Sequence, residues 1–158
     1  MKGVWGCQQS GGSIVSFNKP SFNSYNKTKS LNAPISKSAA SQYTKALGTL
    51  LNSSRQCIHI GDSTTLFWSK KTSSFESDFS FFFENPQKKD GPDSGTHKVK
   101  ALYESIYTGA YKDDDGTIPF YILGLAPNSA RIAIRFWEVG TISEIAGRIK
   151  QYFDDFSI

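Results

Sequence analysis

The sequence predicts an α+β fold, in which a mainly antiparallel sheet built from hairpins is packed against amphipathic helices. Two observations support this class. Apolar residues recur at helical spacing in several separate stretches of the chain. Between these stretches, turn residues join pairs of short strand-like segments. The predicted order is hairpin, helix, hairpin, helices, hairpin and helix, which is typical of helices packed on an antiparallel sheet.

The clearest predicted helix follows Ser36, which is suited to the N-cap position. Pro34 disfavours helical backbone at Ala33, so the helix is expected to begin after these residues. Residues 52–54, Asn-Ser-Ser, end it with side chains that compete for backbone hydrogen bonds. We expect the sheet to cover the apolar stripe of this helix, which consists of Ala39, Ala40, Tyr43, Ala46, Leu47, Leu50 and Leu51.

Three hairpins are predicted from strand-like runs that flank turn residues. Their strand pairs are 4–8 with 13–17, 56–60 with 64–68, and 119–125 with 131–139. The turns are expected at 10–12, 61–62 and 126–128, where Gly, Asp, Pro and Asn favour reversal of the chain.

The remaining helices are predicted from apolar spacing and from one capping motif. Phe75, Phe79, Phe82 and Phe83 predict a short helix that faces the core. Residues 85–96 have the composition of a linker, and 97–108 predict another helix. A capping box at 141–144 opens the last helix, whose stripe contains Ile142, Ile145, Ala146, Ile149, Tyr152, Phe153 and Phe156. We expect residues 1–158 to be a single domain, or a portion of a larger subunit, with a poorly ordered insertion around 69–116.

Charge is distributed unevenly along the chain. The formal net charge is +4, yet residues 1–61 contain seven Lys and Arg residues and no Asp or Glu. A surface of this composition carries positive potential, which favours a polyanionic partner. The alternative is compositional drift in a sequence rich in Asn, Ser and Lys. Both interpretations remain open on this observation.

An aromatic residue followed by Asn occurs three times within residues 16–31. The pairs are Phe17-Asn18, Phe22-Asn23 and Tyr25-Asn26, with three lysines among them. Aromatic rings stack on bases, amides bond to base edges, and lysines neutralise phosphates. The alternative is a long loop that its aromatic residues pin to the core, with Asn favouring turns. The candidate nucleic-acid-binding residues in this segment are Asn18, Lys19, Asn23, Tyr25, Lys27 and Lys29.

The predicted strand 131–139 adds two further candidates. Side chains alternate along a strand, so Arg131, Ala133, Arg135 and Trp137 share one face and Ile132, Ile134 and Phe136 share the other. The apolar face is expected to be core. Arg131 and Arg135 are suited to phosphate or base contacts beside an indole. Alternatively, these arginines pair with carboxylates such as Glu138 or the Asp113 cluster.

The residue pattern argues against catalysis. His59 lies in a predicted strand and His97 opens a predicted helix, and neither has a nearby acidic partner. The sequence contains no nucleophile elbow, phosphate loop or dinucleotide fingerprint. Residues 61–64, Gly-Asp-Ser-Thr, favour an Asx-type turn over a catalytic carboxylate. Residues 112–116 lack the spacing of a calcium loop and are expected to form a solvated hairpin tip. We therefore expect no catalytic residue, no metal site and no cofactor.

The two cysteines and the hydropathy pattern bear on the compartment. Cys7 and Cys57 lack metal-ligand spacing and are expected to be reduced thiols of a cytosolic protein. The sequence has no apolar run of the roughly 18 residues that a membrane span requires. It also opens without a charged and apolar leader. We expect a cytoplasmic protein with no membrane partner.

Four stretches of the chain together resemble one known family. They are IVSFN followed by SFNSY (residues 14–25), NAPIS at the head of a Tyr-Thr-x-Ala-Leu helix (32–47), IGDSTTLFW (60–68), and residues 119–149. In this order they are similar to the large subunit of the subtype I-C CRISPR interference complex, called Cascade. Family members are several times longer, so the chain resembles an internal fragment. The family usually carries an acidic residue where this chain has Lys37.

The resemblance implies a non-catalytic role in RNA-guided antiviral defence. Such a subunit helps to recognise the short motif that flanks a DNA target, and it holds the opened duplex. Guide pairing reads the long sequence, while protein reads the flanking motif and the backbone. The implied partners are target DNA, subunits of the guide-RNA ribonucleoprotein and a recruited helicase–nuclease. The alternative is a protein–protein scaffold that docks these subunits or the helicase–nuclease through aromatic surface near 75–83 without touching DNA.

Overall fold

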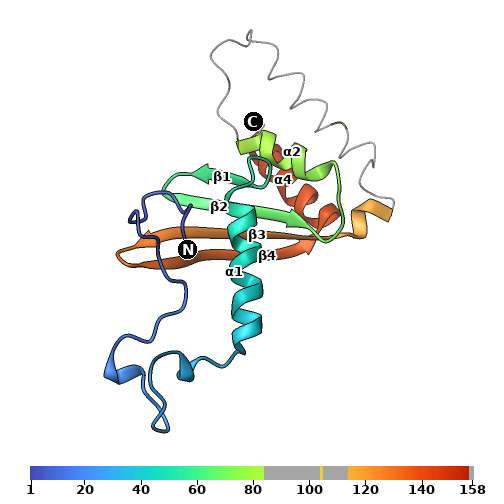
Figure 1. The fold of residues 1–158 in the computed structure, drawn as a ribbon. Helices are drawn as coiled ribbons and strands as arrows, with labels where there is room; N and C mark the ends of the chain where they lie inside the picture. The colour runs from blue at the N-terminus through green and yellow to red at the C-terminus, as the bar shows by residue number, and fades with distance from the viewer. Residues whose placement is uncertain (84–103, 105–113, 157–158) are drawn as a thin grey trace. The chain divides into compact units, whose positions relative to one another are not determined.

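The computed structural model describes residues 1–83, 104 and 114–156 (Figure 1). The helices are α1 (Lys37–Leu51), α2 (Phe75–Phe83) and α4 (Ile142–Phe156), with short 3-10 turns η1 (Pro20–Phe22), η2 (Lys29–Asn32) and η3 (Asp114–Thr117). The strands are β1 (Cys57–Ile60), β2 (Ser63–Ser69), β3 (Pro119–Asn128) and β4 (Arg131–Thr141). They form one sheet in the order β1-β2-β3-β4, so each strand pairs with its neighbour in the chain. The predicted α+β fold, with an antiparallel sheet built from hairpins, is confirmed.

The chain forms two compact units. One contains residues 1–66 and 124–136, and the other contains the described residues of 67–123 and 137–158. All eight candidate binding residues belong to the first unit. The apolar core of the first unit contains Val4, Leu51, Ile58, Leu66, Leu125, Ala126 and Ile132.

Helix α1 begins where the sequence predicts. The Ser36 hydroxyl accepts a hydrogen bond from the Ala39 backbone N–H at 3.1 Å, as an N-cap does. Asn52 caps the other end by donating its side-chain amide to the Gly48 carbonyl at 2.7 Å. The predicted stripe is covered only in part, because Leu51 is buried whereas Ala46 is exposed and the other members are half-buried. The first two turns of α1 therefore keep an accessible apolar side.

The β1–β2 hairpin confirms the prediction for residues 56–68. Cys57 pairs with Leu66 and Ile60 pairs with Ser63, which leaves a two-residue turn. Gly61 occupies that turn with a φ of +60°, a left-handed conformation that glycine adopts without steric cost.

The opening segment differs from the prediction, since residues 4–8 and 13–17 are not strands. Gly6 lies inside the first range with a φ of +75°, which interrupts extended backbone. Ser13 instead forms a parallel bridge with Arg131, at the start of β4. Ser13 thus pairs with a residue distant in sequence, and around the Gly-Gly turn Met1 and Gly12 exchange backbone hydrogen bonds at 2.8 Å without forming a hairpin of two strands.

The β3–β4 hairpin is present, but its turn lies further along the chain than expected. Strand β3 continues to Asn128, and Ser129 turns with a φ of +54°. Ala126 is fully buried, and Pro127 packs against Gly6. Because these contacts hold residues 126–128 in the sheet, the reversal is displaced to residues 129–130.

The apolar face of β4 is core only at its start, which corrects the prediction. Ile132 is 4% exposed, whereas Ile134 is 55% and Phe136 38% exposed. β4 is the outermost strand of the sheet, so its side chains have strand neighbours on one side only. The Phe136 ring lies over Gly124 of β3, where a Cβ atom would come within 2.3 Å of it.

The second unit is built around a cluster of phenylalanines. Phe79 lies 4.8 Å from Phe67 and 5.2 Å from Phe120 between ring centroids. Phe75 is also fully buried, so α2 faces the core as predicted. Phe83 is 41% exposed, and the Phe82 side chain lies outside the described residues.

Helix α4 starts at the predicted capping box. The Thr141 N–H donates to Glu144 Oε2 at 2.8 Å, and the Glu144 N–H donates to Thr141 Oγ1 at 3.2 Å. Burial is confined to the first turns of the helix, because Ile142 is buried and Tyr152 is 60% exposed. The predicted stripe is therefore not core along its whole length.

Several predictions fall on residues that the structure does not describe. These are the linker at 85–96, the helix at 97–108 apart from Glu104, and the first residues of the expected hairpin tip at 112–116. The described part of that tip, Asp114–Thr117, forms the 3-10 turn η3.

Candidate nucleic-acid interface

Residues 16–33, here called the basic loop, are organised by the side chain of Asn32. Its Oδ1 atom accepts a hydrogen bond from the Ser24 N–H at 3.0 Å. Its Nδ2 group donates to the carbonyls of Lys27 at 2.9 Å and Lys29 at 3.1 Å. One amide therefore ties together both ends of the segment 24–29, so the candidate side chains project from a closed loop.

Tyr25 lies at the tip of a tight turn within the basic loop. The Lys27 N–H donates to the Ser24 carbonyl at 2.8 Å, and Tyr25 and Asn26 between them have φ values of +49° and +56°. Two left-handed central residues are characteristic of a type I′ turn, in which Asn is common and Tyr is not. Tyr25 is 93% exposed, so burial does not compensate for its unfavourable backbone. Strain of this kind is typical of functional positions.

Arg131 joins the basic loop to the start of β4. Its Nη2 atom donates to Asn18 Oδ1 at 2.7 Å, and its guanidinium carbon lies 5.4 Å from the centre of the Phe22 ring. Both partners are neutral. Within the described residues no carboxylate pairs with Arg131, so its positive charge remains available to a ligand. Two predicted site residues, Asn18 and Arg131, are thus brought together.

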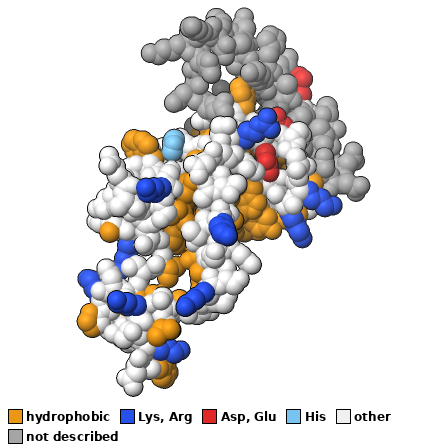
Figure 2. Space-filling view, viewed as in Figure 1, with side chains coloured by type: hydrophobic (Ala, Val, Ile, Leu, Met, Phe, Trp, Pro, Cys, Tyr) orange, Lys and Arg blue, Asp and Glu red, His pale blue; other side chains and the backbone are white. Residues whose placement is uncertain are grey.

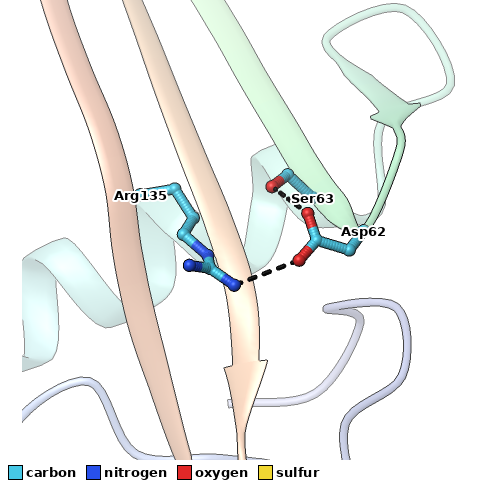
Figure 3. Close-up of polar contacts among 3 residues, drawn as sticks. All are labelled: Asp62, Ser63 and Arg135. Atoms are coloured by element: carbon cyan, nitrogen blue, oxygen red, sulfur yellow. Dashed lines mark hydrogen bonds and ion pairs between the residues drawn. The ribbon is translucent and has the colours of Figure 1, made fainter.

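Arg135 has a different partner from those the sequence suggested. Its guanidinium pairs with Asp62 at 3.0 Å, and Asp62 also accepts a hydrogen bond from the Ser63 hydroxyl at 3.1 Å (Figure 3). Glu138, which the sequence offered as a partner, instead pairs with Arg148 at 3.1 Å. The side chains of Arg135 and Asp62 are 54% and 69% exposed. Exposed pairs of this kind contribute about 1 kcal/mol or less.

The lysines of the basic loop face solvent. Lys19, Lys27 and Lys29 are all exposed. No carboxylate of the described residues lies within ion-pair distance of them. On the face drawn in Figure 2, the N-terminal segment and α1 carry blue side chains and no red ones. The absence of acidic residues from 1–61 therefore produces a surface of one sign.

A cavity of about 580 Å³ opens between the basic loop and the first turns of α1. Most of its lining is apolar and comes from Val15, Phe17, Leu31, Ile35, Ala40 and Tyr43. Asn18, Lys29 and Lys37 line it as well. The half-covered stripe of α1 is thus explained in part, because Ala40 and Tyr43 form one wall of this cavity.

The residues considered for catalysis have structural contacts. Asp62 is engaged as described above, and His59 Nδ1 lies 3.5 Å from the Thr64 hydroxyl, which also accepts the Trp5 N–H at 2.9 Å. Burial raises the pKa of the Cys57 thiol, which disfavours its thiolate. Across the part of the chain that is described, no cluster of three or more His, Cys, Asp or Glu could hold a metal ion. No helix in that part is both long and apolar enough for a bilayer.

Three residues of this region were not among the binding candidates taken from the sequence. Asn32 holds the basic loop, Phe22 lies against Arg131, and Lys37 lines the cavity. The signal for Asn32 was available, since Asn in a loop commonly bonds to nearby backbone. Lys37 also carried a signal, because a cation in the first turn of a helix opposes the helix dipole. The ring of Phe22 could not be paired with Arg131 from sequence, because the two are far apart along the chain.

Comparisons with known proteins identify the family. A family model described as CRISPR-associated protein (Cas_Csd1) matches residues 1–158, the whole of the chain. No curated protein matches the chain. Csd1 is the large subunit of the type I-C complex, so the resemblance identified from four sequence stretches is confirmed.

Proposed function

We propose that this chain, which belongs to the CRISPR-associated Csd1 family, contacts target DNA through its basic loop as a non-catalytic part of an RNA-guided surveillance complex. Membership of the family supports a role in a multi-subunit CRISPR defence complex. In such complexes the guide RNA reads most of the target by base pairing, and protein contacts read the flanking motif and the backbone. The basic loop would supply protein contacts to the flanking motif or the DNA backbone.

The observation that carries this proposal is the turn that displays Tyr25. An almost fully exposed ring is held on left-handed backbone, and Lys27 and Lys29 follow within the next four residues. A ring in this position can stack on an unpaired base, while the lysines neutralise the adjoining phosphates. Asn18 and Asn23 add amide groups that can bond to base edges. None of these contacts requires a bond to be made or broken.

Arg131 gives the loop its support on the sheet. It already bonds to Asn18 and lies over Phe22, so the loop and β4 approach a strand together. A guanidinium group with neutral partners can accept a phosphate as a further partner through its remaining N–H donors. Arg135 would join this surface after exchanging Asp62 for a phosphate.

The salt dependence of DNA binding tests the proposal. The slope of log Kobs against log salt is negative, and each phosphate contact with a duplex contributes about −0.9 to it. Replacing Lys19, Lys27 and Lys29 with Ala should therefore make the slope less steep by up to about 2.7. The control carries the same charge change at Lys45, Lys70 and Lys71, which are exposed and lie outside the loop. Equal slopes for both triple variants would exclude the basic loop from the DNA contact.

A protein-docking role is the second candidate, although not through the surface that the sequence suggested. Phe75 and Phe79 are buried, which counts against docking by the first turns of α2. The second unit instead presents three rings, from three strands, packed against one another. Trp68 lies 5.4 Å from Tyr121 and 5.6 Å from Trp137, which is 48% exposed. Trp68 and Tyr121 are half-buried, and a partly exposed aromatic row of this kind is typical of protein interfaces.

The two candidates predict different effects of one substitution. If the row docks another subunit, Trp137→Ser should weaken assembly of the complex and leave the DNA salt slope of the isolated chain unchanged. If assembly is unaffected, the row is not the docking surface.

A further inference from the structure

The cavity between the basic loop and α1 has the composition of a site for a flat apolar group that carries negative charge at its edge. Its volume of about 580 Å³ lies within the range of small-molecule sites. Phe17 and Tyr43 contribute rings to the lining, and Val15 and Ile35 contribute aliphatic surface. Figure 2 shows apolar surface between basic side chains in this part of the molecule. An aromatic ring would be stabilised here by stacking and by removal from water.

The charges around the cavity are all of one sign. Lys29 and Lys37 line it, and residues 1–61 contain no carboxylate that could neutralise them. Lys37 is the first residue of α1, and the first turn of that helix contains no acidic side chain. A cation at this end of a helix is unfavourable because it adds to the positive end of the dipole. The position of Lys37 is therefore costly for the folded chain alone, and an anion bound beside it would remove that cost.

We propose that this cavity takes one unpaired DNA base, with the flanking phosphates bound by Lys29 and Lys37. The inference rests on the proposed function and specifies it further, since it assigns a base-binding site behind the exposed loop. Apolar walls would select a base over a bare phosphate, and the lysines would select a nucleotide over a neutral ligand. Extruding a base from a duplex costs a few kcal/mol, and least where the strands are already opened. The site would therefore favour opened DNA over intact duplex.

Filling the cavity tests the inference. Ala40→Leu adds bulk to the helix wall, and Ser30→Leu adds it from the loop wall, so the result does not depend on one variant folding. Ala46→Leu is the control, because Ala46 lies on the same helix, is exposed and does not line the cavity. The probes are a short oligothymidylate and a strand of equal length in which every base is replaced by an abasic site.

The expected result is a preference for the base-containing strand that depends on the cavity. Stacking on a single base corresponds to at least about a fivefold difference in affinity. The native chain and Ala46→Leu should show the full preference, and Ala40→Leu and Ser30→Leu should each lose about fivefold of it. Tyr25 is unchanged in the native chain and in the three variants, so its contribution to the preference for the base-containing strand is the same in all four proteins.

The other outcomes are distinguishable. An equal preference in the native chain and in both filled variants would overturn the base site and leave the proposed function intact. Equal affinity of the native chain for the two strands would overturn the base site and also the stacking role of Tyr25, and salt-dependent binding would then support only the phosphate contacts of the lysines. If neither strand binds in a salt-dependent way, the proposed function fails, and the base site fails with it.

Discussion

Replacing Lys37 with Glu should change folding stability and DNA binding in opposite directions. Lys37 opens α1, where the unpaired backbone N–H groups carry partial positive charge. An acidic residue at that position interacts favourably with these groups and a lysine interacts unfavourably. The same substitution removes a cation from the rim of the cavity and introduces an anion there. If Lys37 had no contact with DNA, the substitution would change folding stability and leave DNA affinity as it is.

The magnitudes follow from the exposure of the residue. A charge at a helix end contributes about 0.3–1 kcal/mol at an exposed site, and reversing its sign counts the effect twice. Lys37 is exposed, so Lys37→Glu should raise the free energy of unfolding by about 0.6–2 kcal/mol. For a chain of this length that is a rise in Tm of about 1–8 °C. Loss of one phosphate contact should make the slope of log Kobs against log salt for single-stranded DNA less steep by at least about 0.7.

The assay combines thermal unfolding of the purified chain with a DNA titration at several salt concentrations. The control is Lys45→Glu, which makes the same charge change in the middle of the helix and away from the cavity. It should give no gain in Tm and a smaller loss of binding. If Lys37→Glu instead lowers Tm, or binds DNA as well as the native chain does, the account of this end of α1 is wrong.

Three further substitutions test other parts of the structure. Ser36→Ala should lower the free energy of unfolding by about 1 kcal/mol in urea denaturation because it removes the N-cap, whereas Ser38→Ala within the helix should not lower it. Asp62→Asn should change stability by less than about 1 kcal/mol, since its pair with Arg135 is exposed, and should raise DNA affinity in the same titration; unchanged affinity would exclude Arg135 from the contact surface. Phe79→Ala should cost about 3–5 kcal/mol in thermal unfolding, because this ring is 3% exposed within the phenylalanine cluster, and a loss below about 1 kcal/mol would contradict the description of that core.

Elements with local signals could be predicted from the sequence. Ser36 caps α1, Gly61 turns the first strand pair, and Thr141 with Glu144 caps α4, each through contacts with residues next to it in the chain. Such contacts depend on side-chain chemistry and backbone preference alone. The boundaries of these elements were therefore close to those in the structure.

Elements defined by distant contacts could not be predicted. Ser13 pairs with Arg131 at the opposite end of the sequence, and the sequence alone favoured a hairpin with its own neighbours. Alternation along β4 placed Ile134 on the same face as the buried Ile132. It could not show that this face is uncovered at Ile134, because β4 is the outermost strand. The same limit applied to Arg135, whose partner Asp62 lies in another hairpin.

The sequence indicated candidate residues for the site but not how they are arranged. The basic loop was recognised from repeated aromatic–Asn pairs, and Arg131 from strand alternation. Their direct contact through Asn18 was not foreseen. The cavity beside Lys37 forms because the basic loop lies against α1. The spacing of apolar residues in the sequence does not predict that contact.

Photocrosslinking from position 25 tests the central claim most directly. Tyr25 is replaced by p-benzoylphenylalanine, and the assembled complex is irradiated with a labelled DNA target. The account predicts a crosslink to DNA, because this ring is almost fully exposed at the tip of the basic loop. A crosslink that forms only with another protein subunit would contradict the account and favour the docking role.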